Sequence, residues 1–221
     1  MASDKLTRMK APLLIAAILL AAAPVFAQAS SSAQATPALP QDKHEGITVF
    51  VDAYTKVARA KEKFGKANPL VVGILPVEVF LKNDTDLPVH LNLETIQMEV
   101  QSGDSGSRQD LDWLAPIQVA AAVAHPNGPS QPKVRRFPIG VEGANDSKRD
   151  KMLEIIKPFA LNSDIVPPRG MIHGFLFFDV AGDIPAPGDA TIYIPDLSVA
   201  TSNKPLMFFE VALEKPGETP Q

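Results

Sequence analysis

The stretch that decides the fold runs from Val77 to Val89 and reads Val77-Glu78-Val79-Phe80-Leu81-Lys82-Asn83-Asp84-Thr85-Asp86-Leu87-Pro88-Val89. Its first six residues alternate between aliphatic and other side chains, which is the two-residue period of a β-strand. The following Asn, Asp, Thr and Pro residues have side chains or backbone angles that suit a turn. The stretch therefore predicts a strand over residues 70–82, a turn over residues 83–88 and a second strand from Val89.

Short strands separated by Gly- and Pro-containing turns are predicted over much of the remaining chain. Their ranges are residues 47–52, 89–93, 96–100, 171–180, 190–199 and 206–213. A short surface helix is predicted over residues 55–66, ending at Gly65, where a left-handed residue costs little. Little alternation of strand and helix is present, so the pattern favours an antiparallel β-sandwich over a doubly wound parallel sheet.

Two helical segments interrupt the β pattern. The first covers residues 114–124 and has Pro116 in its first turn, and the second covers residues 150–161, where Pro158 should end or kink it. The Pro- and Gly-rich residues 125–148 between them predict a long irregular connection. We therefore expect a single mainly β domain at residues 43–215, an antiparallel β-sandwich with two inserted helices and a long loop at about residues 108–162.

The N-terminus has the pattern of a secretory signal peptide. A short cationic segment precedes an apolar run at residues 11–26, which is short for a membrane span, and small residues precede Gln28. We predict cleavage after Ala27, with an uncleaved membrane anchor as the alternative. Residues 28–42 are small and polar and predict a disordered tether, and residues 216–221 predict a flexible tail. The expected location is the periplasm or the exterior, without stable membrane insertion after cleavage.

Composition disfavours several classes of function. The 221 residues carry a formal net charge of −4 and include no cysteine. This balance argues against nucleic-acid binding, which needs a cationic surface. The lack of cysteine removes disulfides, thiolate metal sites, iron–sulfur clusters and cysteine nucleophiles. No phosphate-binding loop, Gly-x-Ser-x-Gly elbow or dinucleotide motif is present in the sequence. We expect a protein that is not an enzyme and uses no cofactor.

Two stretches resemble a known family. Residues 77–89 are similar to the strand, Asn-x-Thr turn, Pro and strand unit of secreted bacterial immunoglobulin-like domains. Residues 165–179 are similar to the later part of such domains, in which a Pro/Gly turn precedes a strand of Gly-x-x-x-Phe type. The resemblance implies an immunoglobulin-like sandwich in an exported protein, with a binding or spacer role and no chemistry. The usual domain has about 100 residues, so residues 101–161 are an addition particular to this chain.

Candidate binding residues lie in this addition. Trp113 is the single tryptophan and stands at the entry of the first inserted helix, as a packing anchor or as a contact to a partner. Arg135 and Arg136 belong to a basic cluster, and residues 148–151 form another. Such clusters either remain solvated or meet an anionic surface such as a lipid headgroup or an acidic glycan.

A soft-metal site is an alternative interpretation. Met171 and His173 are two apart on a predicted strand, so their thioether and imidazole share a face and could hold Cu(I). His90 and Met98 would complete the site if their strands were neighbours of this one.

The sequence thus predicts an exported, non-catalytic β-sandwich protein that binds an envelope or extracellular protein of a bacterium through its inserted helices and loop. The alternative is a periplasmic copper carrier that uses Met171 and His173.

Overall fold

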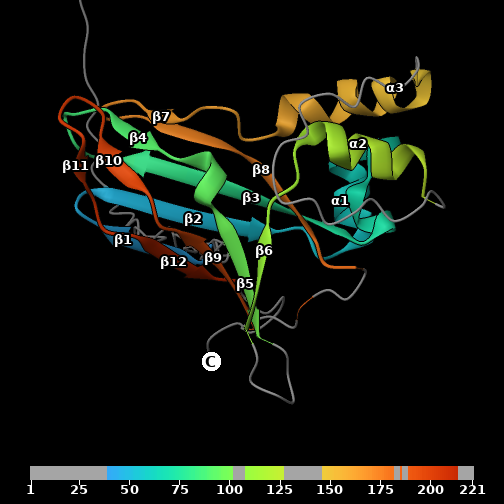
Figure 1. Ribbon diagram of the computed structural model, residues 1–221, viewed down its shortest axis with the longest axis horizontal. Coiled ribbons are helices and arrows are strands. Elements are labelled where there is room, and N and C mark those ends of the chain that lie inside the picture. Colours follow the sequence, from blue (N-terminus) through green and yellow to red (C-terminus); the bar gives the residue numbers. More distant parts are fainter. Residues whose placement is uncertain (1–38, 102–107, 127–145, 182–184, 186–188, 214–221) are drawn as a thin grey trace, which may run out of the picture. The chain divides into compact units, whose positions relative to one another are not determined.

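The strands predicted from the alternation of side chains are present in the computed structural model, which describes residues 39–101, 108–126, 146–181, 185 and 189–213 (Figure 1). Within these residues the strands form three antiparallel sheets. Buried residues of all three sheets belong to one hydrophobic core. The prediction of a mainly β, antiparallel sandwich with inserted helices is confirmed.

The first sheet has the order β1-β2-β3-β8. Its strands are β1 (Gln41–His44), β2 (Ile47–Ala53), β3 (Ile74–Asn83) and β8 (Met171–Asp179). Val49 pairs with Leu81, and Val51 pairs with Val79, so one face of the sheet carries a continuous row of aliphatic side chains. All four are 0% exposed, and this face supplies the centre of the core.

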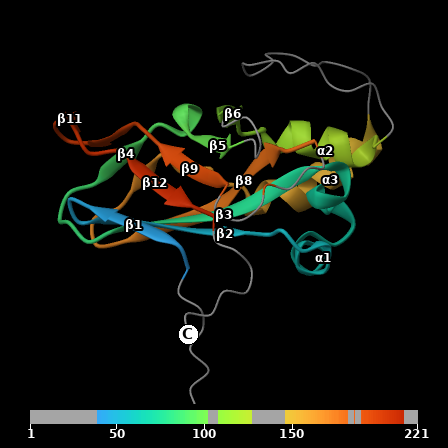
Figure 2. The ribbon, with the colours of Figure 1, turned by 90° about the horizontal axis from the view of Figure 1, so that it is seen from below.

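The other two sheets correspond strand by strand. One has the order β11-β10-β4-β7 and the other β12-β9-β5-β6, and the pairs β4/β5, β9/β10 and β11/β12 each follow one another along the chain. We describe them as two halves of one outer layer, seen beside the first sheet in Figure 2. The strands are β4 (Val89–Leu91), β5 (Gln97–Gln101), β6 (Arg108–Asp112), β7 (Ile165–Val166), β9 (Ala190–Ile194), β10 (Leu197–Val199), β11 (Lys204–Pro205) and β12 (Phe209–Ala212).

The helices gather at one end of the sheets in both views (Figures 1 and 2). They are α1 (Val57–Phe64), α2 (Pro116–Ala124) and α3 (Ser147–Ile156), with short 3-10 turns η1 (Gly65–Ala67), η2 (Pro69–Val72), η3 (Leu93–Thr95) and η4 (Lys157–Phe159). Pro116 occupies the first turn of α2, as predicted, because its missing N–H has no helical partner there. Helix α3 gives way to η4 before Pro158, also as predicted.

Several predicted boundaries were wrong. Residues 70–72 belong to a 3-10 turn rather than a strand. Gly73, with φ 80°, ends this turn, and β3 begins only at Ile74. Helix α3 begins at Ser147, since the Asp146 carboxylate accepts the backbone N–H groups of its first turn. Strand β1 begins at Gln41, inside the predicted tether.

The predicted insertion also started too early. Residues 108–112 form strand β6, which pairs with β5 over its full length. The inserted segment is therefore residues 113–164. The predicted signal peptide, most of the tether, the tail and residues 127–145 of the long loop lie outside the described residues. None of the described helices is long and apolar enough to span a membrane.

A buried carboxylate joins α1 to the first sheet. Glu78 is only 6% exposed, and its Oε2 accepts a 3.1 Å hydrogen bond from the Tyr54 hydroxyl. Its Oε1 lies 3.6 Å from the Lys63 Nζ and 3.5 Å from the His173 Nδ1. The Tyr54 ring packs edge-on against Phe175. Burial and then the neighbouring Glu78 carboxylate raise the pKa of Tyr54 to about 12, because both disfavour the tyrosinate.

This arrangement predicts a separate ionisation of Tyr54. The chain has two tyrosines, so an ultraviolet titration should show a phase with a pKa of about 12 that Tyr54→Phe removes. Since the folded pKa lies above the ordinary value of 10.0, the unfolded chain releases this proton first. The free energy of unfolding should therefore fall as the pH rises from 10 towards 12, and less steeply in Tyr54→Phe. Equal slopes in the two proteins would contradict the assignment.

Candidate functional site

The outer layer has a break at its edge, where the inserted segment leaves and returns. Strand β6 ends at Asp112, opposite Gln97, and β7 begins at Ile165, opposite His90. An uninterrupted edge strand would run directly from one to the other. Instead the chain departs at Trp113, forms α2 and α3, and comes back through residues 160–164.

Both ends of the inserted segment are held by the free edge of β8. Trp113 forms a β-bridge with Phe178, and the Leu114 N–H donates a 2.7 Å hydrogen bond to the Phe177 carbonyl. On the return, the Leu161 N–H donates a 3.0 Å hydrogen bond to the Phe175 carbonyl. The mouth of the insertion is therefore fixed to the buried part of β8, residues 174–178.

A groove of about 440 Å³ lies at this mouth. Its size is within the range of small-ligand sites. The lining combines apolar and polar side chains from η3 and its flanks and from the two ends of the insertion: His90, Leu91, Asn92, Leu93, Glu94, Trp113, Pro116, Lys157, Ala160, Leu161, Asn162 and Asp164. The described lining contains no serine, threonine or cysteine.

Trp113 forms a fixed wall of the groove. Its Nε1–H donates a 2.7 Å hydrogen bond to the Leu93 carbonyl, which locks the indole against η3. The side chain is half-buried. Trp113, predicted as either an anchor or a partner contact, thus anchors the entry of the insertion and also lines the groove.

Three backbone N–H groups of the groove lining already have hydrogen-bond partners. The Leu91 N–H donates to the Asp164 carbonyl at 2.7 Å, and the Asn92 N–H donates to the Asp196 carbonyl at 3.0 Å. The Glu94 N–H donates to the Asn92 side chain at 3.2 Å. An extended peptide would find few free groups here for added-strand pairing. Side chains are therefore the better candidates for recognition in the groove.

Charges in the groove are mixed. Glu94 and Asp164 supply carboxylates, and Lys157 supplies an ammonium group. The His90 Nε2 lies 4.0 Å from the Asp164 Oδ2. Carboxylates outnumber lysines in this lining, so a group rich in hydrogen-bond donors is the better electrostatic match.

The four residues considered for copper do not come together. Met171 and His173 share a face of β8, as predicted, and both are exposed. His90, however, lies on β4, and Met98 is buried on β5, both in the outer layer rather than beside β8. The His173 ring instead stacks on the Phe80 ring, with 5.4 Å between the ring centroids. Among the described residues no group of three or more His, Asp or Glu side chains is placed to hold a metal ion.

The basic candidates fall into two groups. Arg135 and Arg136 lie outside the described residues. Lys148 and Lys151 are exposed on the first turns of α3.

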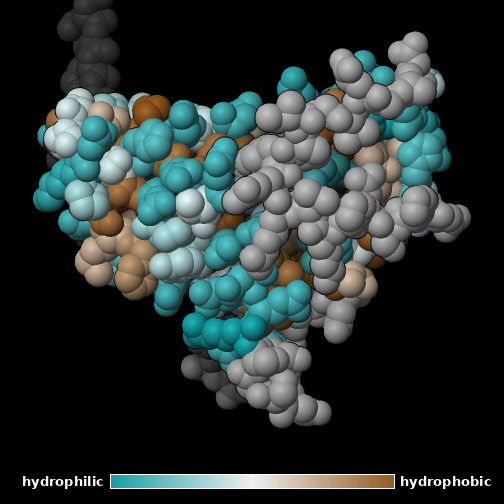
Figure 3. All heavy atoms as spheres, in the orientation of Figure 1, coloured by the Kyte–Doolittle hydropathy of each residue, from teal (hydrophilic) through white to brown (hydrophobic). Residues whose placement is uncertain are grey.

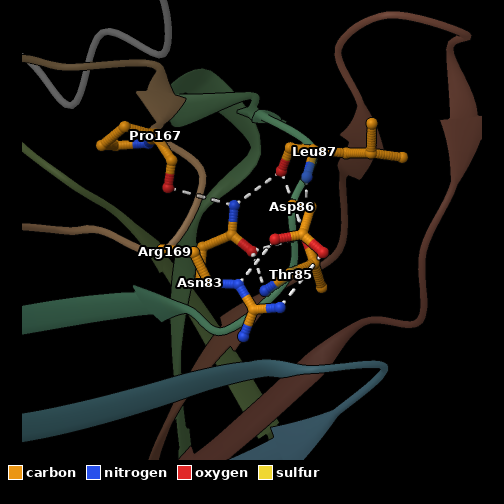
Figure 4. Close-up of polar contacts among 6 residues, drawn as sticks. All are labelled: Asn83, Thr85, Asp86, Leu87, Pro167 and Arg169. Atoms are coloured by element: carbon orange, nitrogen blue, oxygen red, sulfur yellow. Dashed lines mark hydrogen bonds and ion pairs between the residues drawn. The ribbon is translucent and has the colours of Figure 1, made fainter.

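Asn83 joins the two stretches that carried the family resemblance (Figure 4). Its Nδ2 donates hydrogen bonds to the carbonyls of Leu87 at 2.8 Å and Pro167 at 3.2 Å. Its Oδ1 accepts the N–H and the hydroxyl of Thr85, at 2.9 and 2.7 Å. The sequence predicted a turn at Asn83 but contained no signal for the long-range contact to Pro167.

Comparisons with known proteins found no family and only weak structural similarities. No family model matches, and no curated protein matches. A functionally unknown protein from Listeria monocytogenes EGD-e has 11% identity and a TM-score of 0.35, over 81% of this chain and 86% of that one. Northeast Structural Genomics Consortium target SoR45 has 10% identity and a TM-score of 0.30, over 80% and 92%. At these TM-scores neither similarity bears on function.

Proposed function

We propose that this chain is an exported, non-catalytic binding module of the bacterial cell envelope and that its binding site is the groove at the mouth of the insertion. The observation that carries the proposal is the broken edge of the outer layer. There the chain adds residues 113–164 to the sandwich, and both ends of this addition line one groove. Function is concentrated in such additions to a rigid scaffold.

The groove suits one protruding side chain of a protein partner. Trp113, Leu93 and Pro116 offer apolar contact, and Glu94 and Asp164 offer acceptors for a donor-rich tip. A lysine, arginine or amide side chain has both properties, an apolar stem and a polar end. The inserted stem would remove water from the Trp113 ring, and the polar groups of the groove would surround this contact. Centres of protein interfaces have the same arrangement.

The proposal can be tested by photo-crosslinking in cells. A photoreactive residue at exposed Asn162 should yield one reproducible adduct with an envelope protein, because Asn162 lines the groove. The matched control is the same residue at Asn203, which is exposed in the turn between β10 and β11.

A blocking variant makes the result specific to the groove. Glu94 is also exposed and lines the groove, so a photoreactive residue there should capture the same protein, and adding Asn162→Trp should abolish that adduct by filling the space. Capture from Asn203 alone, or an adduct from Glu94 that survives Asn162→Trp, would contradict the groove as the site.

A further inference from the structure

Charge is unevenly distributed over the described residues, with the cations concentrated at the end that carries the helices. Residues 56–66, which include α1, carry five cations and one acid: Lys56, Arg59, Lys61, Lys63, Lys66 and Glu62. The outward face of the β12-β9-β5-β6 sheet has a net negative charge, from Glu99, Asp110, Asp112 and Glu210 against the single cation Arg108, which pairs with Glu99. Such a separation orients a protein in the field of a charged surface, with the helical end towards an anionic one.

Apolar side chains are exposed on three neighbouring elements of this end. Val57 of α1 is 53% exposed, Val71 of η2 is 62% exposed and Ile117 of α2 is 38% exposed. Turn η2 contacts both helices, and the Asn68 side chain before it donates a 3.2 Å hydrogen bond to the Val57 carbonyl. Hydrophilic residues surround smaller hydrophobic areas over the helices in the view of Figure 3.

The cations available at this end are lysines. Arg59 is engaged in a two-pronged ion pair with Asp52, and Arg149 pairs with Asp150. Lys56, Lys61 and Lys66 make no ion pair within the described residues and are exposed. Arginine forks recognise single carboxylates or phosphates with fixed geometry, whereas lysines act as point charges. Free lysines beside exposed valines therefore fit a diffuse anionic surface better than a shaped acidic protein.

From these observations we propose that the helical end, defined by Val57, Val71, Ile117, Lys56, Lys61 and Lys66, docks on the surface of a bilayer that contains anionic phospholipid. Lysines near an anionic bilayer contribute additively and lose their effect in salt, and small apolar side chains enter the headgroup region. This docking surface shares no residue with the lining of the groove, and neither proposal depends on the other.

A local probe tests the docking in the full chain. The chain has no cysteine, so Val71→Cys gives a single position for an environment-sensitive fluorophore. Vesicles of phosphatidylglycerol and phosphatidylcholine should shift its emission to the blue, and high salt should reverse the shift. Phosphatidylcholine vesicles should produce no shift. A probe at Asn203→Cys should not respond. Both labelled proteins contain the apolar run at residues 11–26, so this run cannot explain a difference between the two probe positions.

Charge reversal gives the decisive comparison. Each lysine near the surface is worth about a fivefold change in partitioning, so Lys61→Glu/Lys66→Glu should weaken binding at least tenfold. Lys43→Glu/Lys204→Glu makes the same charge change at exposed sites on β1 and β11 and should have little effect. Equal binding of both double variants would overturn the proposal. So would a probe response to soluble polyglutamate without one to vesicles, which would indicate an acidic protein instead.

Discussion

Gly174→Ala is expected to lower the free energy of unfolding by about 3 kcal/mol, because the backbone of the inserted segment packs directly against this residue of β8. A Cβ at position 174 would lie 2.5 Å from both the Cα and the N of Leu161 and 2.9 Å from the carbonyl carbon of Ala160. These are backbone atoms, so no side-chain rotation relieves the contact. The returning chain must lift away from the strand.

Chemical denaturation of Gly174→Ala and Gly65→Ala separates this crowding from an ordinary glycine effect. Gly65 has φ 57° and ψ −118° and open space around its Cβ position, so alanine there costs about 1–3 kcal/mol from backbone strain alone. Hydrogen exchange at the Leu161 N–H gives a local reading, since its bond to the Phe175 carbonyl should weaken only in Gly174→Ala. Similar losses in both variants, with Leu161 still protected, would contradict this explanation.

The same substitution connects the scaffold to the proposed binding site. Ala160 and Leu161 line the groove, so their displacement should also reduce crosslinking from a photoreactive residue at Asn162. The glycine in the Gly-x-x-x-Phe pattern thus has a physical role, which is to admit the backbone of the insertion.

The sandwich could be predicted because its core strands carry their own signal. Val49 and Val51 on β2, and Val79 and Leu81 on β3, alternate with other residues over several positions, and each set is buried on one side. Local periodicity is sufficient for such strands. The helices could be predicted for a similar reason, from spacing and from the positions of proline.

The groove could not be predicted, because its walls are defined by long-range pairing. Strand β6 reads Arg-Gln-Asp-Leu-Asp and has one apolar residue, and β7 has two residues in all. Neither contains a measurable period. Asn92, Asn162 and Asp164 resemble ordinary loop residues until η3 and the returning chain are brought together. Trp113 alone carried a signal, since a single tryptophan at a helix entry indicates either packing or binding.

Asn83→Ala is the second substitution with a large expected effect, a loss of about 3 kcal/mol in the free energy of unfolding. Asn83 is 0% exposed, and its amide joins the turn after β3 to the segment between β7 and β8. Alanine would leave the carbonyls of Leu87 and Pro167 and the N–H of Thr85 without these partners. Buried polar groups without partners are costly because folding has removed their water.

A control in the same turn distinguishes the buried amide from the exposed charges beside it. Asp86 forms a bidentate ion pair with Arg169, which lowers the pKa of the Asp86 carboxyl, and both side chains lie in solvent. Asp86→Asn should leave the unfolding midpoint nearly unchanged, because water and salt screen such pairs. A loss as large as that of Asn83→Ala would assign the stability of this turn to the ion pair instead.

Asn83→Asp tests the direction of the hydrogen bonds rather than the space that the residue fills. An ionised carboxylate would still accept from Thr85 but would place an oxygen against the carbonyls of Leu87 and Pro167. Burial and these carbonyls favour the protonated acid, so the folded pKa should lie above the unfolded value of about 3.9. A raised folded pKa means that stability is greatest below the unfolded pKa and falls as the pH rises through the folded one. The deficit of Asn83→Asp should therefore grow from acidic to neutral pH, whereas that of Asn83→Ala should stay constant; parallel curves would show that the donor at this position does not matter.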